Sequence, residues 1–438
     1  MKPKGLLIAV IVLAVLGVAV FWSNRKQAAA SKSPVDASLK LLSIPDDQFQ
    51  DIRVKKVTGE VFDLSRENGK WALKEPQPLP ADQDAASGLV SSLSSLNGDK
   101  LIEDKATDLS PYGLNDPTLE VTVTKKDGKQ DKLLVGNDTL NGSGAYAKLA
   151  GDPRVLTIAS FVKTSLDKRP DDLRDKRLLT FDSDKLTRVE LQAKAPAVEF
   201  GKNSDKEWQI IKPRPLRADG TAVDTLVSKL KDAKMDLQNP DADAAKKYAG
   251  ATKVAVATVT DASGNQTLEV RRDKDKNYFA KSSVVEGVYK IANDVGDGLD
   301  KGLDDFRNKK LFDFGFSDPS KLDINGVLYV KTGDKWVTGG KTMDNISVQN
   351  LIDKLRDLAA TKFVEKGAGD PVFNATVTSN DGKRVEKVTI RKQGDQYFAQ
   401  RENEPSIYEL SAQSVTDLQK AAADVKEAAP PAKDAKKK

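Results

Sequence analysis

The chain contains no cysteine and no histidine among its 438 residues. Without cysteine it has no disulfides and no thiolate nucleophiles, and without both residues it lacks the usual ligands for zinc. Every histidine-based triad and proton shuttle is excluded as well. An oxidising compartment is allowed, but no disulfide is used there. Any catalysis would have to use Asp, Glu, Lys, Ser or Tyr, and we expect neither a metal nor a cofactor.

A strong excess of one charge is also missing. The 70 basic and 65 acidic residues give a net charge of +5 and are mixed along the chain, apart from the last few residues. A nucleic-acid-binding protein normally concentrates its basic residues in a patch or stripe. We therefore expect no nucleic-acid partner. The length favours two to four domains, because one ordinary core rarely serves so long a chain.

Long apolar runs are absent with one exception, the uncharged run Gly5–Trp22. At about 18 residues it approaches the roughly 20 that span a bilayer, and it exceeds a typical secretory h-region. Arg25 and Lys26 also come before the first alanine cluster. We expect residues 1–22 to form an uncleaved signal anchor, N-terminus inside, with the bulk of the chain extracytoplasmic (periplasmic). A cleaved signal peptide is the alternative.

One stretch recurs in the remainder of the chain. NGKWALKEPQPLPAD at residues 68–82 is matched by DKEWQIIKPRPLRAD at residues 205–219 in the Trp, two Pro, the Leu, the Ala and the Asp. A third, weaker copy follows. The three copies place a tryptophan and then an aspartate at equivalent positions: Trp71, Trp208, Trp336, Asp82, Asp219 and Asp344.

The spacing after each of these aspartates predicts an amphipathic helix. Apolar residues recur at positions +4, +7, +8 and +11, the period of one helical face. They are Ala86, Leu89, Val90, Leu93; Val223, Leu226, Val227, Leu230; and Val348, Leu351, Ile352, Leu355. Each aspartate stands where an N-cap belongs. Because a fold needs each tryptophan in every copy and a single active site does not, we expect the tryptophans to be core residues.

The copies continue in register through alternating segments with Gly128, Gly264 and Gly382 at hairpin turns. The fold class is therefore α+β: three tandem repeats of a strand-helix-meander-helix unit with antiparallel sheets, preceded by one transmembrane helix. The expected domains are the anchor at 1–22, a flexible tether at 23–48, repeat units at 49–182, 183–318 and 319–427, and a disordered Lys-rich tail at 428–438.

The repeated G-x-W and P-x-P-L-x-A-D patterns, together with YGLNDP at residues 112–117 and DLRDKRLLTFD at residues 172–182, resemble the bacterial "domain of unknown function 4340" family. The resemblance covers nearly everything after the tether. It implies a membrane-anchored extracytoplasmic protein, and some members are encoded near transport systems similar to the ABC-type gliding-motility auxiliary complex. The family offers no catalytic residues to carry over.

DLRDKRLL and its counterpart DFRNKKLF at residues 305–312 carry the main charge clusters. One interpretation is a docking surface for an anionic partner or a membrane, formed by Arg174, Lys176, Arg177, Arg307, Lys309 and Lys310. The other is a helix start, with Asp172 or Asp305 as the cap and the arginine in a surface ion pair. No carboxylate stands in the apolar setting of a tuned acid, so we expect no catalytic residues and no enzyme.

The sequence supports three hypotheses about function. The first is a membrane-tethered extracytoplasmic accessory or scaffold protein without catalysis, attached to an ABC-type transport or envelope assembly through a protein partner. The second is a structural envelope protein that binds cell-wall polymer. The third is a carboxylate-dependent hydrolase.

Overall fold

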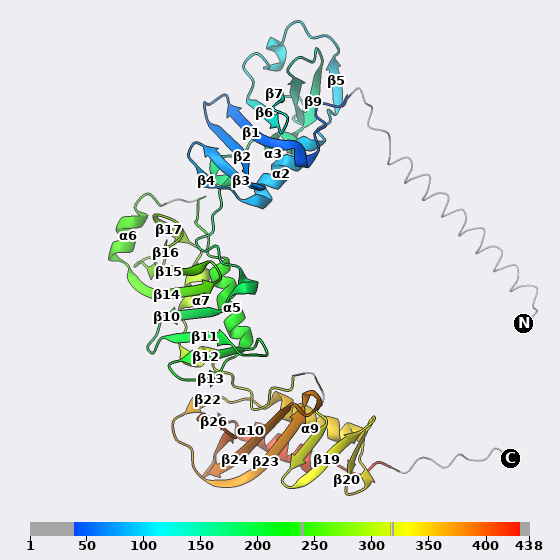
Figure 1. Cartoon of the computed structure of the whole chain (residues 1–438), viewed down its shortest axis with the longest axis vertical. Coiled ribbons are helices and arrows are strands. Elements are labelled where there is room, and N and C mark those ends of the chain that lie inside the picture. The colour runs from blue at the N-terminus through cyan, green and yellow to red at the C-terminus, as the bar shows by residue number, and fades with distance from the viewer. Residues whose placement is uncertain (1–38, 238–240, 316, 318, 430–438) are drawn as a thin grey trace, which may run out of the picture. The chain divides into compact units, whose positions relative to one another are not determined.

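We describe a computed structural model of the chain, which covers residues 39–237, 241–315, 317 and 319–429. The chain divides between Lys176 and Arg177 into two compact units, unit 1 (residues 1–176) and unit 2 (residues 177–438). Unit 1 holds one antiparallel sheet, and unit 2 holds two (Figure 1). Each sheet has its own large hydrophobic core. The predicted α+β class with three repeated units is confirmed at this level.

Unit 1 is the first repeat, and its sheet has nine strands in the order β4-β3-β2-β1-β6-β7-β8-β9-β5. The strands are β1 (Phe49–Lys56), β2 (Val61–Glu67), β3 (Lys70–Glu75), β4 (Leu79–Pro80), β5 (Lys100–Glu103), β6 (Leu119–Lys125), β7 (Gln130–Asp138), β8 (Gly144–Leu149) and β9 (Val155–Ala159). The helices are α2 (Gln83–Ser94), α3 (Ser160–Leu166) and α4 (Pro170–Leu173), with short 3-10 turns at Asp46–Gln48 and Ser110–Tyr112.

The second repeat opens unit 2 with a sheet in the order β13-β12-β11-β10-β14-β15-β16-β17. Its strands are β10 (Arg188–Gln192), β11 (Val198–Lys202), β12 (Trp208–Lys212), β13 (Leu216–Arg217), β14 (Thr252–Asp261), β15 (Gly264–Arg272), β16 (Tyr278–Ser282) and β17 (Val288–Ile291). Its helices are α5 (Gly220–Lys231), α6 (Ala244–Gly250), α7 (Asn293–Leu299) and α8 (Leu303–Phe306), after a 3-10 turn at Ser183–Lys185.

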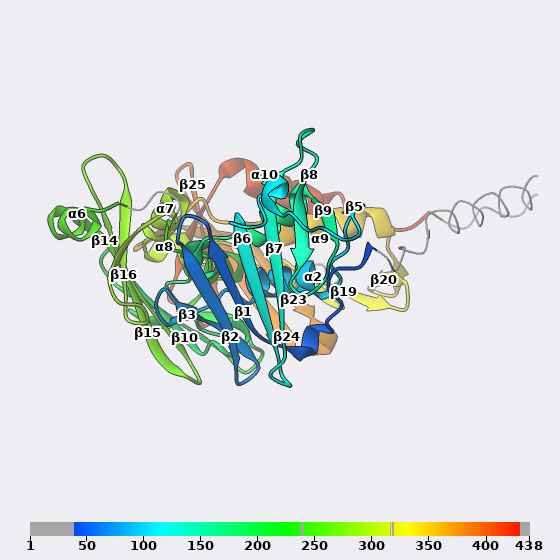
Figure 2. The ribbon, with the colours of Figure 1, turned by 90° about the horizontal axis from the view of Figure 1, so that it is seen from above.

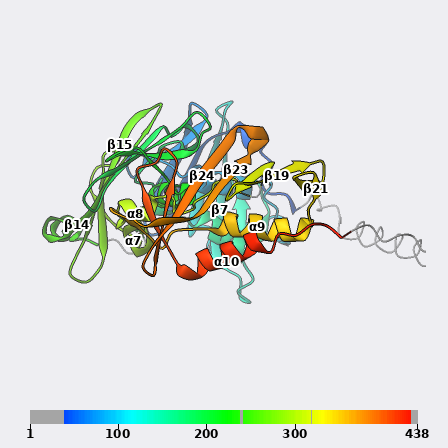
Figure 3. The same cartoon turned by 90° about the horizontal axis from the view of Figure 1, so that it is seen from below.

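The third repeat has the sheet order β21-β20-β19-β18-β23-β24-β25-β26-β22. Its strands are β18 (Lys321–Ile324), β19 (Val327–Thr332), β20 (Lys335–Thr338), β21 (Lys341–Thr342), β22 (Lys362–Val364), β23 (Asp370–Ser379), β24 (Arg384–Gln393), β25 (Gln396–Arg401) and β26 (Ile407–Leu410). Its helices α9 (Asn345–Asp357) and α10 (Ala412–Ala423) pack side by side (Figure 3), and a 3-10 turn lies at Asn380–Gly382.

The strand pairing has the same register in the three repeats. The first and fourth major strands pair through Ile52↔Val123 in the first repeat, Val189↔Val259 in the second and Leu322↔Val377 in the third. All of these side chains are fully buried. Along each strand, buried positions alternate with more exposed ones, so one face of each sheet packs against the helices.

The equivalent aspartates cap the helices that follow them. The Asp82 carboxylate accepts hydrogen bonds from the backbone N–H groups of residues 84 and 85, Asp219 accepts one from residue 222, and Asp344 accepts one from residue 347. The apolar stripe of each helix is buried, and the three tryptophans are 4–7% exposed. Trp208 donates its indole N–H to the carboxylate of Asp224 at 2.7 Å.

We expect Asp219→Ala to lower the free energy of unfolding of unit 2 by about 1 kcal/mol, because an N–H in the first turn of α5 loses its acceptor. Asp219→Asn retains an oxygen acceptor and should cost much less. Chemical denaturation of both variants measures the difference. Equal stability of Asp219→Ala and the parent protein would contradict the capping role.

The second repeat departs from the other two at the edge of its sheet. The edge strands β5 and β22 have no counterpart there among residues 39–237 and 241–315, and α6 occupies the corresponding part of the chain. Ala244 and Tyr248 of α6 pack against Phe279 of β16, and the three residues form a small separate core. The helix therefore covers the β16–β17 edge of this sheet, which a ninth strand covers elsewhere.

Each repeat begins earlier than the periodicity indicated. Leu41 and Leu42, inside the predicted tether, are buried in the first core, and Leu178 and Leu311 lie at the same position in the second and third cores. Each of these leucines donates its backbone N–H to a carbonyl just after the capped helix of its own repeat. Leu41 and Leu42 donate to Leu96, Leu178 to Ala233, and Leu311 to Leu358. From the sequence, Leu178 and Leu311 fall at the end of the preceding unit, because they follow its charged motif.

The motifs DLRDKRLL and DFRNKKLF end a helix and do not begin one. Asp172 and Asp305 reach back to the backbone N–H of Arg169 and Gly302, so each aspartate caps the short helix in which it lies. After that turn the chain extends, and residues 174 and 307 form β-bridges to Ala81 and Ala218. The third repeat closes in the same way through the bridge between residues 427 and 343.

The predicted signal anchor at residues 1–22 lies outside the described residues, as do most of the predicted tether and the Lys-rich tail. Among the residues that the structure describes, no helix has the length and hydropathy needed to cross a membrane.

Candidate functional site

A cleft with a volume of about 740 Å³ lies between the second and third repeats of unit 2. The turn before β12, strand β13 and the start of α5 line it from the second repeat. Strand β24 and the segment that enters the third repeat line it from the other side. Its wall carries six basic side chains against four acidic ones, and the basic ones are Lys202, Lys206, Arg217, Lys383, Arg384 and Arg401.

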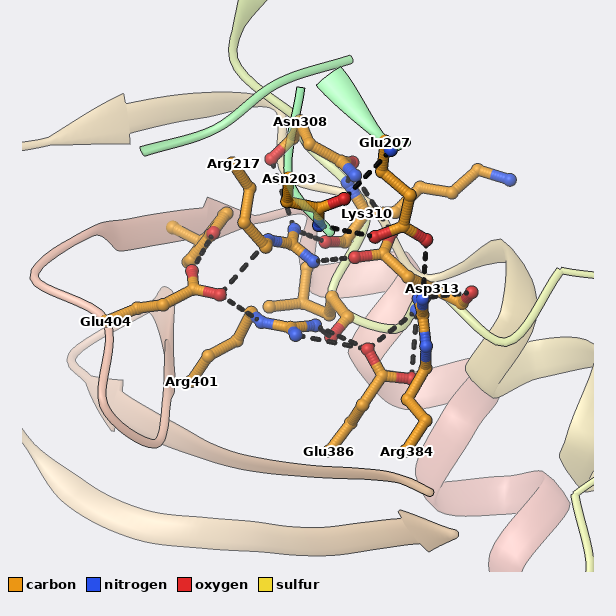
Figure 4. A network of polar contacts seen from close by, with 12 residues as sticks. Asn203, Glu207, Arg217, Asn308, Lys310, Asp313, Arg384, Glu386, Arg401 and Glu404 are labelled. Atoms are coloured by element: carbon orange, nitrogen blue, oxygen red, sulfur yellow. Dashed lines mark hydrogen bonds and ion pairs between the residues drawn. The ribbon is translucent and has the colours of Figure 1, made fainter. Parts of the chain in front are cut away.

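Arg217 joins the two repeats at the base of this cleft (Figure 4). It projects from β13, and its guanidinium pairs with Asp313 at 2.5 Å and with Glu404 at 3.1 Å. It also donates to the carbonyl oxygen of Lys310. The Arg217 side chain is 14% exposed, so these charges interact with little screening. Asn308 holds the second oxygen of Asp313 at 2.8 Å.

The network continues through Arg401 inside the third repeat. Its guanidinium pairs with Glu404 at 2.7 Å and with Glu386 at 3.1 Å. The Glu386 carboxylate also accepts the backbone N–H of Asp313 at 2.9 Å. Burial raises the pKa of the Glu386 carboxyl, although the charge of Arg401 acts in the opposite direction. Burial also raises the pKa of the Tyr408 phenol, which donates to Glu404, to about 12.

A second ion pair crosses the mouth of the cleft. Arg384 of β24 pairs with Glu207 in the turn before β12 at 2.6 Å. Burial acts to raise the pKa of Glu207, but the hydrogen bonds from Arg384 and Asn203 outweigh it and lower the pKa overall. Glu207 therefore stays ionised and keeps its partner at neutral pH.

The second repeat makes the same contacts with uncharged residues. There the backbone N–H of Thr180 donates to the Gln266 side chain at 2.8 Å, as Asp313 does to Glu386. The Ser282 hydroxyl donates to the carbonyl of Leu178, where Arg401 donates to the corresponding carbonyl in the third repeat. The third repeat thus carries charges where the second has an amide and a hydroxyl. These charges are linked to Arg217 of the preceding repeat through Glu404 and Asp313.

The lysines of the cleft are arranged differently from its arginines. Within the described residues, Lys202, Lys206 and Lys383 form no ion pair with a carboxylate. Lys202 lies 4.7 Å from the ring centroid of Trp208, in a cation–π contact. Val385 of β24 also lines the cleft and is 55% exposed. The cleft therefore offers three positive charges and one apolar side chain to an anionic, partly apolar ligand. We call this set the lysine rim.

The residues proposed from the sequence as a docking surface lie on two separate connecting segments. Arg174 and Lys176 belong to unit 1, whereas Arg177, Arg307, Lys309 and Lys310 belong to unit 2. Arg307 is not an exposed docking cation. Its guanidinium stacks over Phe363 at 3.4 Å from the ring centroid and donates to Ser406 at 2.9 Å. For the other residues of this set, docking stays a prediction.

The cleft could not be predicted from the sequence, because the residues that meet in it are far apart along the chain. The only available signal was a break in the repeat pattern. Arg217 stands where the first copy has Pro80, and Asp313 stands where the second copy has Thr180. Arg217 and Asp313 are thus charged residues at two different positions of the repeat where another copy has an uncharged residue. Such a pair is a candidate for a contact between repeats.

Each carboxylate that lines the cleft has a side-chain partner. Asp224 accepts from Trp208, and Glu207, Asp313 and Glu386 each face an arginine. A hydrolytic pair needs one carboxyl group free to give a proton and another free to attack or to activate water. In the part of unit 2 that the structure describes, no group of three or more acidic side chains is placed to hold a metal ion.

Comparison with known proteins agrees with the repeated fold. The family model described as "Domain of unknown function (DUF4340)" matches residues 71–208 and again residues 208–374. Both matched segments begin at an equivalent core tryptophan. No curated protein and no solved structure matches the chain significantly. The two consecutive matches, over most of the described residues, show that the chain belongs to the DUF4340 family.

Proposed function

We propose that this protein is a membrane-tethered, extracytoplasmic, non-catalytic accessory protein that binds a partner at an ABC-type transport or envelope assembly. The cleft of unit 2 is the observation that carries the proposal. Its carboxylates are engaged by arginines or by Trp208, while the lysine rim is left for a ligand. Such a site favours binding of an anionic, partly apolar segment over bond cleavage.

The uncharged run Gly5–Trp22 supports the tether, because its length approaches that of a bilayer-spanning helix. The absence of cysteine and histidine supports a non-catalytic role by removing the commonest nucleophiles and general bases. The resemblance of the repeats to proteins encoded near ABC-type transport systems supports the kind of assembly.

We expect the triple variant Lys202→Glu, Lys206→Glu, Lys383→Glu to lose most of its binding to this partner while remaining folded. Reversing three charges on the rim replaces attraction by repulsion and mainly slows association. The matched control reverses Lys129, which lies on an exposed turn of unit 1. Crosslinked pull-downs from native membranes compare the recovered partner across the variants.

Recovery of transporter subunits with the parent and the control, but not with the triple variant, supports the proposal. Equal recovery of the partner with all three proteins would show that the cleft does not bind it. Recovery of no protein, combined with binding to isolated wall material, would replace the accessory role by a structural envelope role. Turnover of a glycan substrate would revive the hydrolase hypothesis.

A further inference from the structure

The two most exposed large apolar side chains of the described residues lie at one edge of unit 1. Leu140 is fully exposed in the loop between β7 and β8, and Phe161 at the start of α3 is 76% exposed. The two segments are in contact, because Ser160 donates its backbone N–H to the carbonyl of Ser143 at 3.1 Å. We call this pair the Leu140–Phe161 patch. Figure 2 shows the loop beside β8 projecting beyond the sheet.

The polar groups of the loop that carries Leu140 form hydrogen bonds within the loop itself. Thr139 donates its backbone N–H to Gly144 at 2.8 Å, and Gly142 donates its N–H to Thr139 at 2.8 Å. The side-chain oxygen of Asn141 accepts hydrogen bonds from the hydroxyls of Thr139 and Ser143, both at 2.8 Å. These bonds hold the turn in shape and lower the cost of removing it from water.

Charge is also absent from the patch. No charged residue lies between Asp138 and Lys148, or between Arg154 and Lys163, along the two segments. The two charges that border the patch, Asp138 and Lys163, neutralise each other in an ion pair of 2.6 Å. A surface of this kind can be removed from water without burying an unpaired charge.

The patch lies near the place where the chain enters unit 1. The carbonyl of Leu39 accepts the backbone N–H of Gly98, and the next residue, Asp99, donates its N–H to Thr157, both at 2.7 Å. Thr157 belongs to β9, which leads directly into α3 and so to Phe161. Residue 39 therefore lies near the strand that leads into the helix carrying Phe161.

We propose that the Leu140–Phe161 patch contacts the lipid bilayer, inserting its two side chains into the interfacial layer of the membrane that holds the N-terminus. The inference rests on the proposed function, because it requires the anchor at residues 1–22. The 16 residues from 23 to 38 can span at most roughly 55 Å, so unit 1 stays close to the lipid surface. At such an effective concentration, even a weak contact is occupied.

The absence of cysteine makes a direct test possible, because an introduced cysteine is the only thiol in the chain. We would attach an environment-sensitive fluorophore to Leu140→Cys in the full-length protein and reconstitute it in phosphatidylethanolamine–phosphatidylglycerol vesicles containing shallow doxyl-labelled lipid. The matched control carries the fluorophore at Lys129→Cys, on the exposed turn before β7, which is the opposite end of that strand from the loop. Flotation of the vesicles reports separately whether the protein is anchored.

We expect the label at position 140 to be quenched several-fold more strongly than the label at position 129. Adding Phe161→Ser should reduce that quenching, because half of the apolar surface is lost. Protein that floats with the vesicles but shows equal, weak quenching at both positions would overturn the lipid contact and leave the anchor intact. Protein that does not float would overturn the anchor and the lipid contact together. A label shielded in native membranes but not in vesicles would assign the patch to a protein partner instead.

Discussion

Trp208→Ala should destabilise unit 2 by about 3–5 kcal/mol, the largest effect that we expect from a single substitution. The indole is 7% exposed and packs in the core of the second repeat. Its removal leaves a cavity and also leaves the Asp224 carboxylate without the indole N–H. Thermal and chemical denaturation of the full-length protein in detergent measure the loss.

Two further variants separate the contributions to this effect. Trp208→Phe retains most of the buried ring and loses the hydrogen bond, so we expect a smaller cost of about 1–3 kcal/mol. Ile346→Ala removes an apolar side chain that is 73% exposed on α9, and its effect should stay within about 0.5 kcal/mol. A melting curve of Trp208→Ala that overlays the parent curve would refute the core assignment.

Arg217→Ala should have the second largest effect, a loss of about 2–4 kcal/mol. Breaking a wholly buried ion pair typically costs about 3–5 kcal/mol, and the modest exposure of these side chains reduces that figure. The Asp313 and Glu404 carboxylates are 21% and 19% exposed, and each loses a cation when Arg217 is removed. Because the arginine joins two repeats, the second and third cores should also unfold less cooperatively, in two resolved transitions.

The matched control for this prediction is Arg53→Ala. Arg53 forms an ion pair with Glu75 at 2.8 Å, but the two side chains are 46% and 42% exposed. Exposed pairs contribute about 0–1 kcal/mol, so this variant should remain close to the parent in stability. If Arg217→Ala were no more destabilising than Arg53→Ala, the network at the cleft would not hold the repeats together.

The architecture could be predicted from the sequence because its signals are local and occur three times. The tryptophans, the capping aspartates and the buried helical stripe follow from spacing alone, and each copy supports the others. The glycines at Gly128, Gly264 and Gly382 lie at turns with positive φ angles of 80–117°, the conformation that favours glycine. The order of strands, helix, meander and final helix followed from these positions.

The parts that differ between the copies could not be predicted in this way. Helix α6 replaces an edge strand only in the second repeat, and its contacts with Phe279 depend on the sheet that it covers. Arg217 and Asp313 are 96 residues apart, so no local pattern links them. The burial of Leu41 and Leu42 could not be predicted either, because a short apolar pair without periodicity does not reveal that it packs in a core.

We propose that the repeats lie outside the cytoplasmic membrane, held there by the N-terminal segment. The most direct test is labelling of full-length Lys129→Cys in intact spheroplasts with a membrane-impermeant maleimide, since this cysteine is the only thiol and its position is exposed. We predict rapid labelling without lysis and recovery of the labelled protein in the membrane fraction. Labelling only after the cells are lysed, or labelled protein in the soluble fraction alone, would contradict the account.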